Sequence, residues 1–600
     1  MANTLDDPDY YLRHFSVLLN GLGRYRDLLS ENELKLQDCP NTLPSGALRL
    51  LVRLLSRRGG YFRISKLSYP DIPELAQACA ELEQQGFITL GESPEPGILS
   101  SLITRNELAA AISKLQPVGI EEDVDTRASA KHPHDSPPLK TATKQQLIAH
   151  ADTTLLADGT TLWTGIARQF RDDVLRLDAT AAYDTLRLLY FGNAWQQSDE
   201  FVVTELGYRR YEDYRLDEAN RRFDTRHEVE LALLCADVAQ ALEDTRQLPL
   251  ATLEDLVEVL KSQLSSCVSL EFSAEPKPQF LCDTGRQGRK LGHLLSRIAR
   301  EYERRDLTEQ ALFLYQGLEL VPARERRVRC LEALGRYQEA FHGAKALFES
   351  PLADEEYHAS LRMLPRLAKK AGLRWHNLAP LSLSEQKLEL AAKPGVEYAA
   401  LKHFDAQGIA GWHLENAFSC GLFGLALWDI LFAPVKGAFD HPFQTAPSDM
   451  YQPEFSQRRQ AMLDERLFAL NQGDLSMLSR HFHRKHGIAN DWVNWTLWSE
   501  TLLTSLLPYL TGPFVASLVE RLLQDLRARR SGFPDLVLIR DGQLAFVEVK
   551  GPGDRLADHQ KDWLSWLGNK EMASEVLWVT WRTEQATDEE AKDVIGATRP

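Results

Sequence analysis

The chain has 600 residues, of which 44% are hydrophobic and 26% are charged, and its formal net charge is −16. This length exceeds what one hydrophobic core usually organises, so about three to five domains are expected. The ordinary composition excludes fibrous, collagen-like and globally disordered proteins. The negative net charge does not exclude a nucleic-acid partner, because phosphate contacts need local cationic surface rather than a basic whole.

The sequence predicts a protein of the reducing cytoplasm with no membrane partner. Its first seven residues include two acidic and no basic residues, so they lack the basic start of a secretory signal. The most apolar stretch, Ala417–Trp428, is well short of the about 20 residues of a membrane span and predicts a buried helix. The seven cysteines are scattered without a CxxC pair, which argues against a structural zinc site and a disulfide framework.

Helices and short strands interleave near the N-terminus. Apolar helical patterns cover Ala47–Leu55 and Ile72–Gln85, and each is followed by a short β-like run, Tyr61–Ile64 and Phe87–Leu90. Residues 1–95 are therefore predicted to form a helical, winged-helix-like DNA-binding domain.

The next segment has two short helical patterns separated by a polar stretch. Leu99–Leu115 is helical, and Thr104 with Glu107 forms a capping box inside it. Residues 117–140 are rich in acidic residues, Pro, Ser and His and predict a flexible insertion. A further helix opens at Thr143. We expect a SAP-like DNA-binding module over residues 96–162.

Helical patterns dominate residues 163–384. Small and aromatic residues recur in two units, as in helix-turn-helix repeats, but the spacing from Ala311 to Ala340 is 29 residues, shorter than the usual 34 or so. A TPR-like helical scaffold is predicted, and whether it is a true repeat stays open.

The segment Gly532–Lys550 predicts a β-hairpin that carries chemistry. Two apolar, β-branched runs flank Asp541-Gly542, a dipeptide suited to a two-residue type I′ turn. If Arg540 pairs with Gln543, Asp535 falls opposite Glu548, where directly opposed Cβ atoms are about 4.5–5.5 Å apart. The two carboxylates can then reach one cation.

Glu548 and Lys550 project from the same face because side chains alternate along a strand. Two close carboxylates repel each other in an apolar setting, and a divalent metal relieves that repulsion. Oxygen ligands favour one or two hard ions, Mg²⁺ or Mn²⁺. The alternative interpretation is a surface salt bridge with Lys550.

Pro534-Asp535 followed by Glu548-Val549-Lys550 resembles the PD-(D/E)xK nuclease superfamily. The flanking residues are similar to the VRR-type nuclease domain and, more closely, to the Fanconi-associated nuclease family, in which a bacterial member is expected. This resemblance is carried by Arg530–Asp535, Val547–Leu556, Gln560, Trp563, His413–Asn416, Gly437–Phe439, Pro442–Gln444, Pro447–Tyr451, Phe455–Arg459, Phe191–Asn193, Lys66–Tyr69 and Tyr10–Leu12.

The resemblance implies a multidomain, mostly α-helical chain that ends in an α/β, restriction-endonuclease-like nuclease domain over residues 385–600. It implies that Glu415 is a further metal ligand, although a helix-start carboxylate favoured by the helix dipole is the plainer interpretation. Val549 would add its carbonyl as a ligand, Lys550 would orient the attacking water or stabilise charge, and Gln560 would support the site.

The resemblance implies that the partner is branched or flapped double-stranded DNA, and protein partners are unknown. Arg527 and Arg530 precede the motif and are placed to grip phosphates, and Arg555 and His559 follow it as further candidate DNA contacts. His559 stands where relatives often have a phosphate-binding lysine. A histidine grips a 5′ phosphate less firmly than lysine, so selection of a phosphorylated flap is in doubt.

The resemblance further implies a 5′ flap endonuclease and 5′–3′ exonuclease in interstrand crosslink repair. We expect it to act in the cytoplasm, in association with the nucleoid. The alternatives are a junction-resolving or restriction-like endonuclease and a non-catalytic repair scaffold. The about 400 residues of additional helical machinery, several times one ordinary domain, disfavour the former. The intact acids and lysine disfavour the latter.

Overall fold

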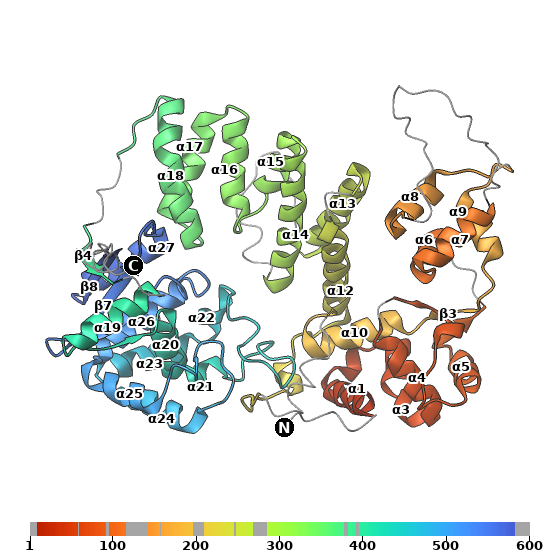
Figure 1. The fold of residues 1–600 in the computed structure, drawn as a ribbon, viewed down its shortest axis with the longest axis horizontal. Helices are drawn as coiled ribbons and strands as arrows, with labels where there is room; N and C mark the ends of the chain where they lie inside the picture. Colours follow the sequence, from red (N-terminus) through yellow and green to blue (C-terminus); the bar gives the residue numbers. More distant parts are fainter. Residues whose placement is uncertain are drawn as a thin grey trace, which may run out of the picture. The chain divides into compact units, whose positions relative to one another are not determined.

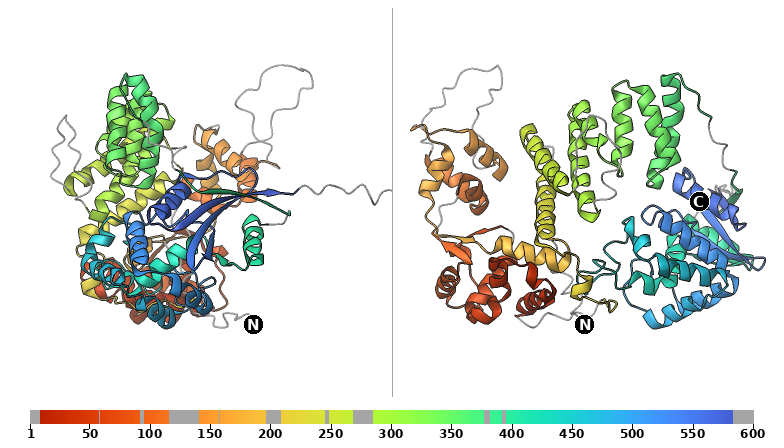
Figure 2. Two further views of the ribbon diagram at one scale, coloured as in Figure 1. Left: turned by 90° about the vertical axis from the view of Figure 1, so that its left-hand side faces the viewer. Right: turned by 180° about the vertical axis from the view of Figure 1, so that it is seen from behind.

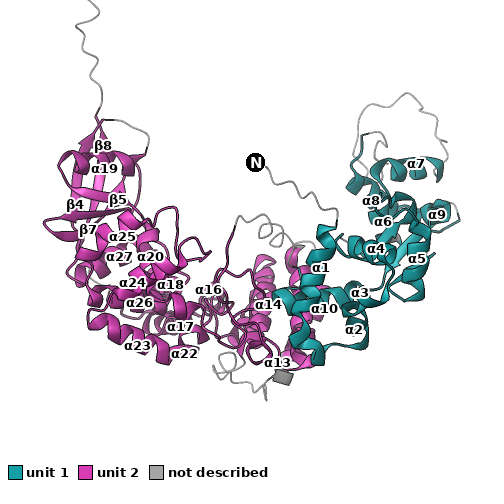
Figure 3. Cartoon of the chain, turned by 90° about the horizontal axis from the view of Figure 1, so that it is seen from below, with its two compact units in different colours: residues 1–198 teal, residues 199–600 magenta. Residues whose placement is uncertain are grey.

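A computed structural model describes residues 9–57, 59–91, 95–115, 141–156, 158–195, 209–244, 248–267, 285–376, 382–391 and 395–582. The chain divides into two compact units, residues 1–198 and 199–600 (Figure 3). The predicted flexible insertion at 117–140 lies outside the described residues. Within them, no single helix has the length and apolar content to cross a bilayer, although α25 (Glu500–Leu506), its extension to Tyr509 and α26 (Gly512–Gln524) pass that test together as a bent pair.

The first unit begins with a helical cluster and a small sheet. Its helices are α1 (Tyr10–Gly21), α2 (Glu31–Gln37), α3 (Cys39–Thr42), α4 (Ser45–Leu55) and α5 (Leu75–Gln84), and its strands are β1 (Tyr61–Arg63), β2 (Ile88–Leu90) and β3 (Val174–Leu177). The strand order is β1-β3-β2 with antiparallel pairs. The predicted helix at Ala47–Leu55 and the strand at Phe87–Leu90 are confirmed, and the predicted helix at Ile72 begins three residues later.

The predicted boundary between residues 162 and 163 is wrong in one respect. The central strand β3 and helix α10 (Thr180–Phe191), which were assigned to the scaffold, pack with the first helices instead, and the Tyr190 ring lies directly against Gly21. The helical segment for which a SAP-like module was predicted is therefore inserted between strands β2 and β3 of one sheet. The sequence did not reveal this because the pairing of β3 with β1 and β2 is long-range.

The inserted module has its own small core. It consists of α6 (Pro96–Leu102), α7 (Arg105–Leu115), α8 (Lys144–Thr153) and α9 (Leu162–Gln169). The capping box is confirmed, because Thr104 N donates to Glu107 Oε2 at 2.8 Å and Glu107 N donates to Thr104 Oγ1 at 3.3 Å. The single predicted helix at Leu99–Leu115 is two helices that meet at Ile103-Thr104.

A series of helices packs side by side in the middle of the chain (Figure 1). They are α12 (Arg226–Ala241), α13 (Leu250–Cys267), α14 (Gly285–Arg304), α15 (Thr308–Gln316), α16 (Ala323–Ala333), α17 (Tyr337–Glu349) and α18 (Asp354–Ala371). Ala311 and Ala340 are fully buried at equivalent places in α15 and α17. The helical scaffold is thus present, as predicted.

The C-terminal part is built on a five-stranded mixed sheet in the order β4-β8-β7-β6-β5. Its strands are β4 (Glu385–Leu390), β5 (Ala410–His413), β6 (Leu536–Arg540), β7 (Gln543–Lys550) and β8 (Ala573–Trp581). β4, β8 and β7 run parallel, whereas β7, β6 and β5 are antiparallel. Its helices are α19 (Val396–Ala406), α20 (Asn416–Ala426), α21 (Trp428–Leu431), α22 (Glu454–Arg458), α23 (Gln460–Asn471), α24 (Ser476–Lys485) and α27 (Asp558–Asn569), with α25 and α26.

Both faces of this sheet are covered (Figure 2). Val547 and Val549 of β7 pack toward α19, and Leu544 and Phe546 belong to the larger core that includes α20, α26 and α27. Because side chains alternate, Glu548 projects to the face of the larger core. The predicted buried helix at Ala417–Trp428 forms the centre of that core as α20 and the start of α21.

Candidate active site

The β6–β7 hairpin has the predicted register. Arg540 pairs with Gln543 and Leu536 pairs with Val547, and Asp541 and Gly542 have φ values of 52° and 74°. Asp535 therefore lies one step beyond the last pair, opposite Glu548. Its Oδ2 accepts a hydrogen bond of 2.8 Å from Val549 N, which places this carboxylate against the end of β7.

Glu548 is a buried acid with one satisfied oxygen and one without a partner. Glu548 is 1% exposed, and its Oε1 accepts hydrogen bonds from Lys550 Nζ at 2.7 Å and from Gln560 Nε2 at 2.5 Å. Among the described residues, Oε2 has no hydrogen-bond partner. Burial, followed by the charge of Asp535, raises the pKa of Glu548 to about 7. The salt bridge with Lys550 exists, but it is buried rather than at the surface.

Glu415 reaches the site from the corner between β5 and α20. Its backbone N and that of Leu414 both donate to the Asp535 carbonyl at 3.1 Å, so this corner is tied to the residue before β6. Glu415 has φ 47° and makes no side-chain cap on α20. A non-glycine residue in this region is strained, and such strain clusters at functional sites.

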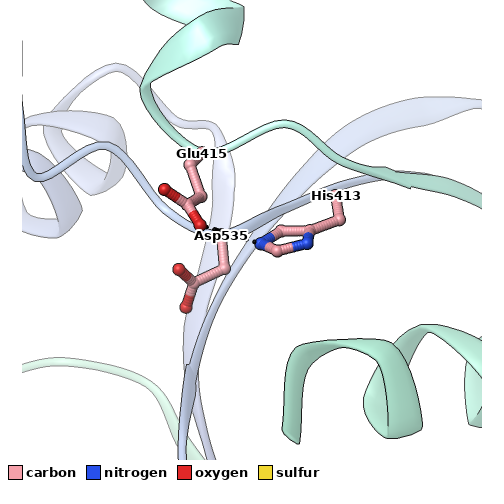
Figure 4. Close-up of side chains that lie close together, drawn as sticks. All are labelled: His413, Glu415 and Asp535. Atoms are coloured by element: carbon pink, nitrogen blue, oxygen red, sulfur yellow. Dashed lines mark hydrogen bonds and ion pairs between the residues drawn. The ribbon is translucent and has the colours of Figure 1, made fainter. Parts of the chain in front are cut away.

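His413 joins the group, and the sequence did not identify it as a site residue. Its Nε2 lies 3.0 Å from Glu415 Oε1, and ligand atoms of His413, Glu415 and Asp535 all lie within 4.8 Å of one another. Figure 4 shows the imidazole and the Glu415 carboxylate turned toward each other beside Asp535. The available clue was its position two residues before Glu415 at the end of a strand.

These donors fit a divalent cation. Three carboxylates lie close together here. Glu548 has a buried oxygen without a partner among the described residues, burial raises the pKa of Asp535, and Glu415 lies beside them. The group has more negative charge than the nearby cations balance. Desolvated carboxylates in this arrangement are stabilised by a metal. The structure does not test whether the Val549 carbonyl contributes, and that assignment stays a prediction.

Gln560 occupies the predicted supporting position. Its Oε1 accepts from Ala557 N at 2.9 Å while its amide donates to Glu548, so one side chain links the start of α27 to the site. The approach to Asp535 is also fixed, because Asn416 Oδ1 accepts from Phe533 N at 3.0 Å.

The four candidate DNA-contacting residues differ in their exposure and in whether other protein groups already bind their side chains. Arg527 is exposed and stacks on Tyr451, with its guanidinium 5.1 Å from the ring centroid, and Arg555 is exposed in the loop after β7. Arg530 is half-buried and donates to the Tyr451 hydroxyl and to the Asp491 carbonyl. Its guanidinium thus already has protein partners.

His559 lines a cleft of about 440 Å³ between α18 and α27. Both cations and acids line this cleft. Several of them are paired with each other: Arg529 with Asp354 at 2.8 Å, Arg362 with Asp558 at 3.2 Å and His358 with Asp562 at 2.6 Å. The cleft is therefore not a purely cationic pocket.

Comparison with known protein families finds a match near each end of the chain. Residues 472–581 match the VRR-NUC domain, and residues 9–89 match the FAN1 HTH domain. The Fanconi-associated nuclease 1 homolog of Pseudomonas aeruginosa is 32% identical over 589 residues, which cover 97% of each chain. The homolog of Oryza sativa subsp. japonica is 26% identical over 92% of this chain and 61% of its own length.

Two solved structures share the fold. The crystal structure of paFAN1 bound to 2-nt 5′ flap DNA with a gap has a TM-score of 0.76 and 30% identity, covering 97% of this chain and 100% of that one. The structure of paFAN1 bound to a 1-nt 5′ flap has a TM-score of 0.75 and 31% identity over 96% of this chain. With the site geometry above, these comparisons establish that the chain belongs to the Fanconi-associated nuclease 1 family and is a divalent-metal-dependent DNA nuclease.

Proposed function

We propose that this nuclease cleaves branched double-stranded DNA near a 5′ flap, as a 5′ flap endonuclease and 5′–3′ exonuclease that serves interstrand crosslink repair. The observation that carries the proposal is the group of Asp535, Glu548 and Lys550 at one end of the hairpin, with Oε2 of Glu548 buried and unpartnered among the described residues. Support for the flap comes from the two paFAN1 structures, whose fold this chain matches over nearly its whole length. A location in the cytoplasm, near the nucleoid, stays a prediction.

Asp535, Glu548 and Glu415, with the Val549 carbonyl, would hold one or two Mg²⁺ or Mn²⁺ ions. When bound, such ions neutralise charge on the phosphate and lower the pKa of water so that it can attack. The protein fixes these ligands in advance: Val549 N holds Asp535, the Asp535 carbonyl holds the backbone of Glu415, and Gln560 holds Glu548.

Lys550 would act at the phosphate from a fixed position. Its ammonium is 2.7 Å from Glu548 Oε1, and its side chain is 11% exposed. Its charge is therefore held in an environment of low dielectric constant, next to a proposed metal ligand. There it orients the attacking water or stabilises negative charge on the phosphate oxygens. Charge held in place before the reaction avoids a reorganisation cost during it.

Arg527 and Arg555 would grip the DNA backbone because both are exposed. Arg530 would act mainly by holding Tyr451, whose ring also supports Arg527. Phosphate contacts of this kind make affinity depend on salt without reading sequence.

The test is cleavage of a labelled 5′-flap duplex by the full chain with Mg²⁺ or Mn²⁺. Wild type should cut near the flap, and Asp535→Asn should lose most of the activity because its amide is a poor metal ligand. Asp541→Asn is the matched control, because this residue sits in the turn of the same hairpin with positive φ, which asparagine tolerates. This control should keep full activity.

Two outcomes would contradict the proposal. Equal activity of Asp535→Asn and wild type would show that the hairpin carboxylate is not needed for cleavage. Symmetric resolution of four-way junctions in preference to flaps would favour the junction-resolving alternative.

A further inference from the structure

We propose that His413 is a ligand of the same metal site through Nε2, so that the site contains one imidazole nitrogen besides its oxygens. The inference rests on the proposed metal site and adds a residue and a metal preference to it. Three observations support it: the position of the ring, the rigidity of the corner that carries it, and the unmet need for positive charge around it.

The position of the ring follows from the sheet. His413 is the last residue of β5 and pairs with Leu536 of β6, so it stands beside Asp535, which precedes β6. Its Nε2 is 3.0 Å from Glu415 Oε1 and belongs to the set of ligand atoms that lie within 4.8 Å of one another (Figure 4). One cation placed among these atoms would be within reach of all three residues.

The corner between β5 and α20 holds this arrangement. The Asp535 carbonyl accepts hydrogen bonds from both Leu414 N and Glu415 N, so the backbone between the two side chains cannot move independently of Asp535. The positive φ of Glu415 gives the chain a sharp bend at the residue whose side chain meets His413. A preorganised group of this kind loses little entropy when it binds an ion.

The carboxylates next to the ring belong to an acidic group that calls for a cation. Glu548 Oε2 is buried and unpartnered among the described residues, and the negative charges of Asp535 and Glu415 act on the Glu548 carboxylate. His413 and Glu415 have side chains that are 38% and 53% exposed, so an ion from solvent can reach them. A hydrogen bond between Nε2 and Glu415 Oε1 would give the same distance without a metal, and the ¹⁴N measurement described below separates the two arrangements.

The chemical consequence concerns metal choice. Imidazole suits transition metals, whereas Mg²⁺ is bound by oxygen ligands and water. Coordination through Nε2 would therefore favour Mn²⁺ over Mg²⁺, and the ring proton would reside on Nδ1. The expectation of oxygen-only ligands, drawn from the sequence, would be replaced by a mixed set.

The experiment is pulsed electron paramagnetic resonance of Mn²⁺ bound to the full chain. Wild type should show ¹⁴N modulation from a directly bound imidazole, and uniform ¹⁵N-histidine labelling should change it. The modulation should disappear in His413→Gln, which keeps an amide donor for Glu415. His403→Gln is the matched control, because His403 is a histidine of the same domain that contacts Gln407, and it should keep the modulation.

The outcomes separate this inference from the metal site itself. If Mn²⁺ binds, is lost in Glu548→Ala and shows no ¹⁴N modulation, His413 is not a ligand and the metal site stands. Modulation that persists in His413→Gln overturns the inference as well. If wild type and Glu548→Ala bind Mn²⁺ equally, the proposed metal site fails together with the ligand.

The affinities of the protein for Mn²⁺ and Mg²⁺ provide an independent measurement. His413→Gln should weaken Mn²⁺ binding by at least about tenfold, since even groups that only support ligands contribute about 10- to 100-fold to metal affinity. Mg²⁺ binding, measured by competition with Mn²⁺, should change much less. Equal losses for both ions would show that His413 only positions Glu415, and would overturn the assignment of His413 as a ligand.

Discussion

Gln560 donates its side-chain amide to Oε1 of Glu548 across 2.5 Å, to the same oxygen that accepts from Lys550. This bond leaves Oε2 of Glu548 as the oxygen without a partner among the described residues. Gln560 thus determines which carboxylate oxygen is available for the site, although it lies on a helix and outside the hairpin.

Gln560→Ala is expected to lower activity by about 10- to 100-fold, the usual effect of removing a group that orients a metal ligand. Gln560→Glu keeps the acceptor for Ala557 N but places a carboxylate beside Glu548, so its activity should be at least as low. Flap cleavage rates at saturating metal provide the measurement. The matched control is Gln460→Ala, whose amide contacts Asp464 on α23. Full activity of Gln560→Glu would show that only the helix cap matters.

Asp449→Ala should destabilise the C-terminal unit strongly. Asp449 and Arg459 form a salt bridge of 2.9 Å, and their side chains are 2% and 0% exposed. Removing the carboxylate leaves a buried guanidinium without its counter-charge, at a cost of about 3–5 kcal/mol. The melting temperature should fall clearly. The double variant Asp449→Leu, Arg459→Met should recover part of the loss, and exposed Asp464→Asn should change little. A melting temperature of Asp449→Ala equal to that of wild type would contradict this role.

The hairpin could be predicted from the sequence because its determinants are local. Alternating apolar residues and Asp541-Gly542 set the turn, and the turn sets the register that places Asp535 opposite Glu548. The partners on either side of the hairpin could not be predicted in the same way. β8 and β5 join it through long-range pairing, so the neighbours they bring to the site were hidden.

His413 shows this limit most clearly. Its strand is short and lies at the edge of the sheet, so no clear alternation marks the histidine as a site residue. Arg530 shows the same limit from the other side: it is next to the motif in sequence, and the sequence did not reveal that Tyr451 and Asp491, both distant in sequence, accept its hydrogen bonds. The two acids of the hairpin lie opposite each other as expected, because the hairpin that brings them together is local.

His358→Gln should lower stability more at pH 6 than at pH 8.5. His358 Nε2 donates a hydrogen bond of 2.6 Å to Asp562 Oδ2, and this bond raises the pKa of His358. The pair joins α18 of the scaffold to α27. A raised folded-state pKa means that the charged pair stabilises fully below the unfolded pKa of about 6.5 and loses this effect as pH rises through the folded value. Because Asp562 is partly exposed, the effect should be at most about 1 kcal/mol.

Melting temperatures of wild type and His358→Gln across this pH range provide the check. His342→Gln, a variant of another scaffold histidine on α17, serves as the control and should show no matching pH trend. A constant difference between wild type and His358→Gln at all pH values would show that the pair contributes through packing rather than charge.

The 5′ phosphate of the flap should matter little to this enzyme. His559 lies beside Gly532, and its cleft contains carboxylates as well as cations, so a terminal phosphate would meet a mixed field. An imidazole also carries less positive charge near pH 7.5 than an ammonium. Flaps ending in a phosphate or a hydroxyl should therefore be cut at similar rates.

His559→Lys should raise the preference for the phosphorylated flap by about tenfold, the usual scale of one added charge-assisted hydrogen bond. Parallel cleavage of the two substrates by both proteins measures this, with Lys561→Arg as a charge-preserving control on the same helix. A strong phosphate preference in wild type would show that the arginines of the cleft, Arg362, Arg521, Arg527 and Arg529, hold the phosphate despite the nearby acids.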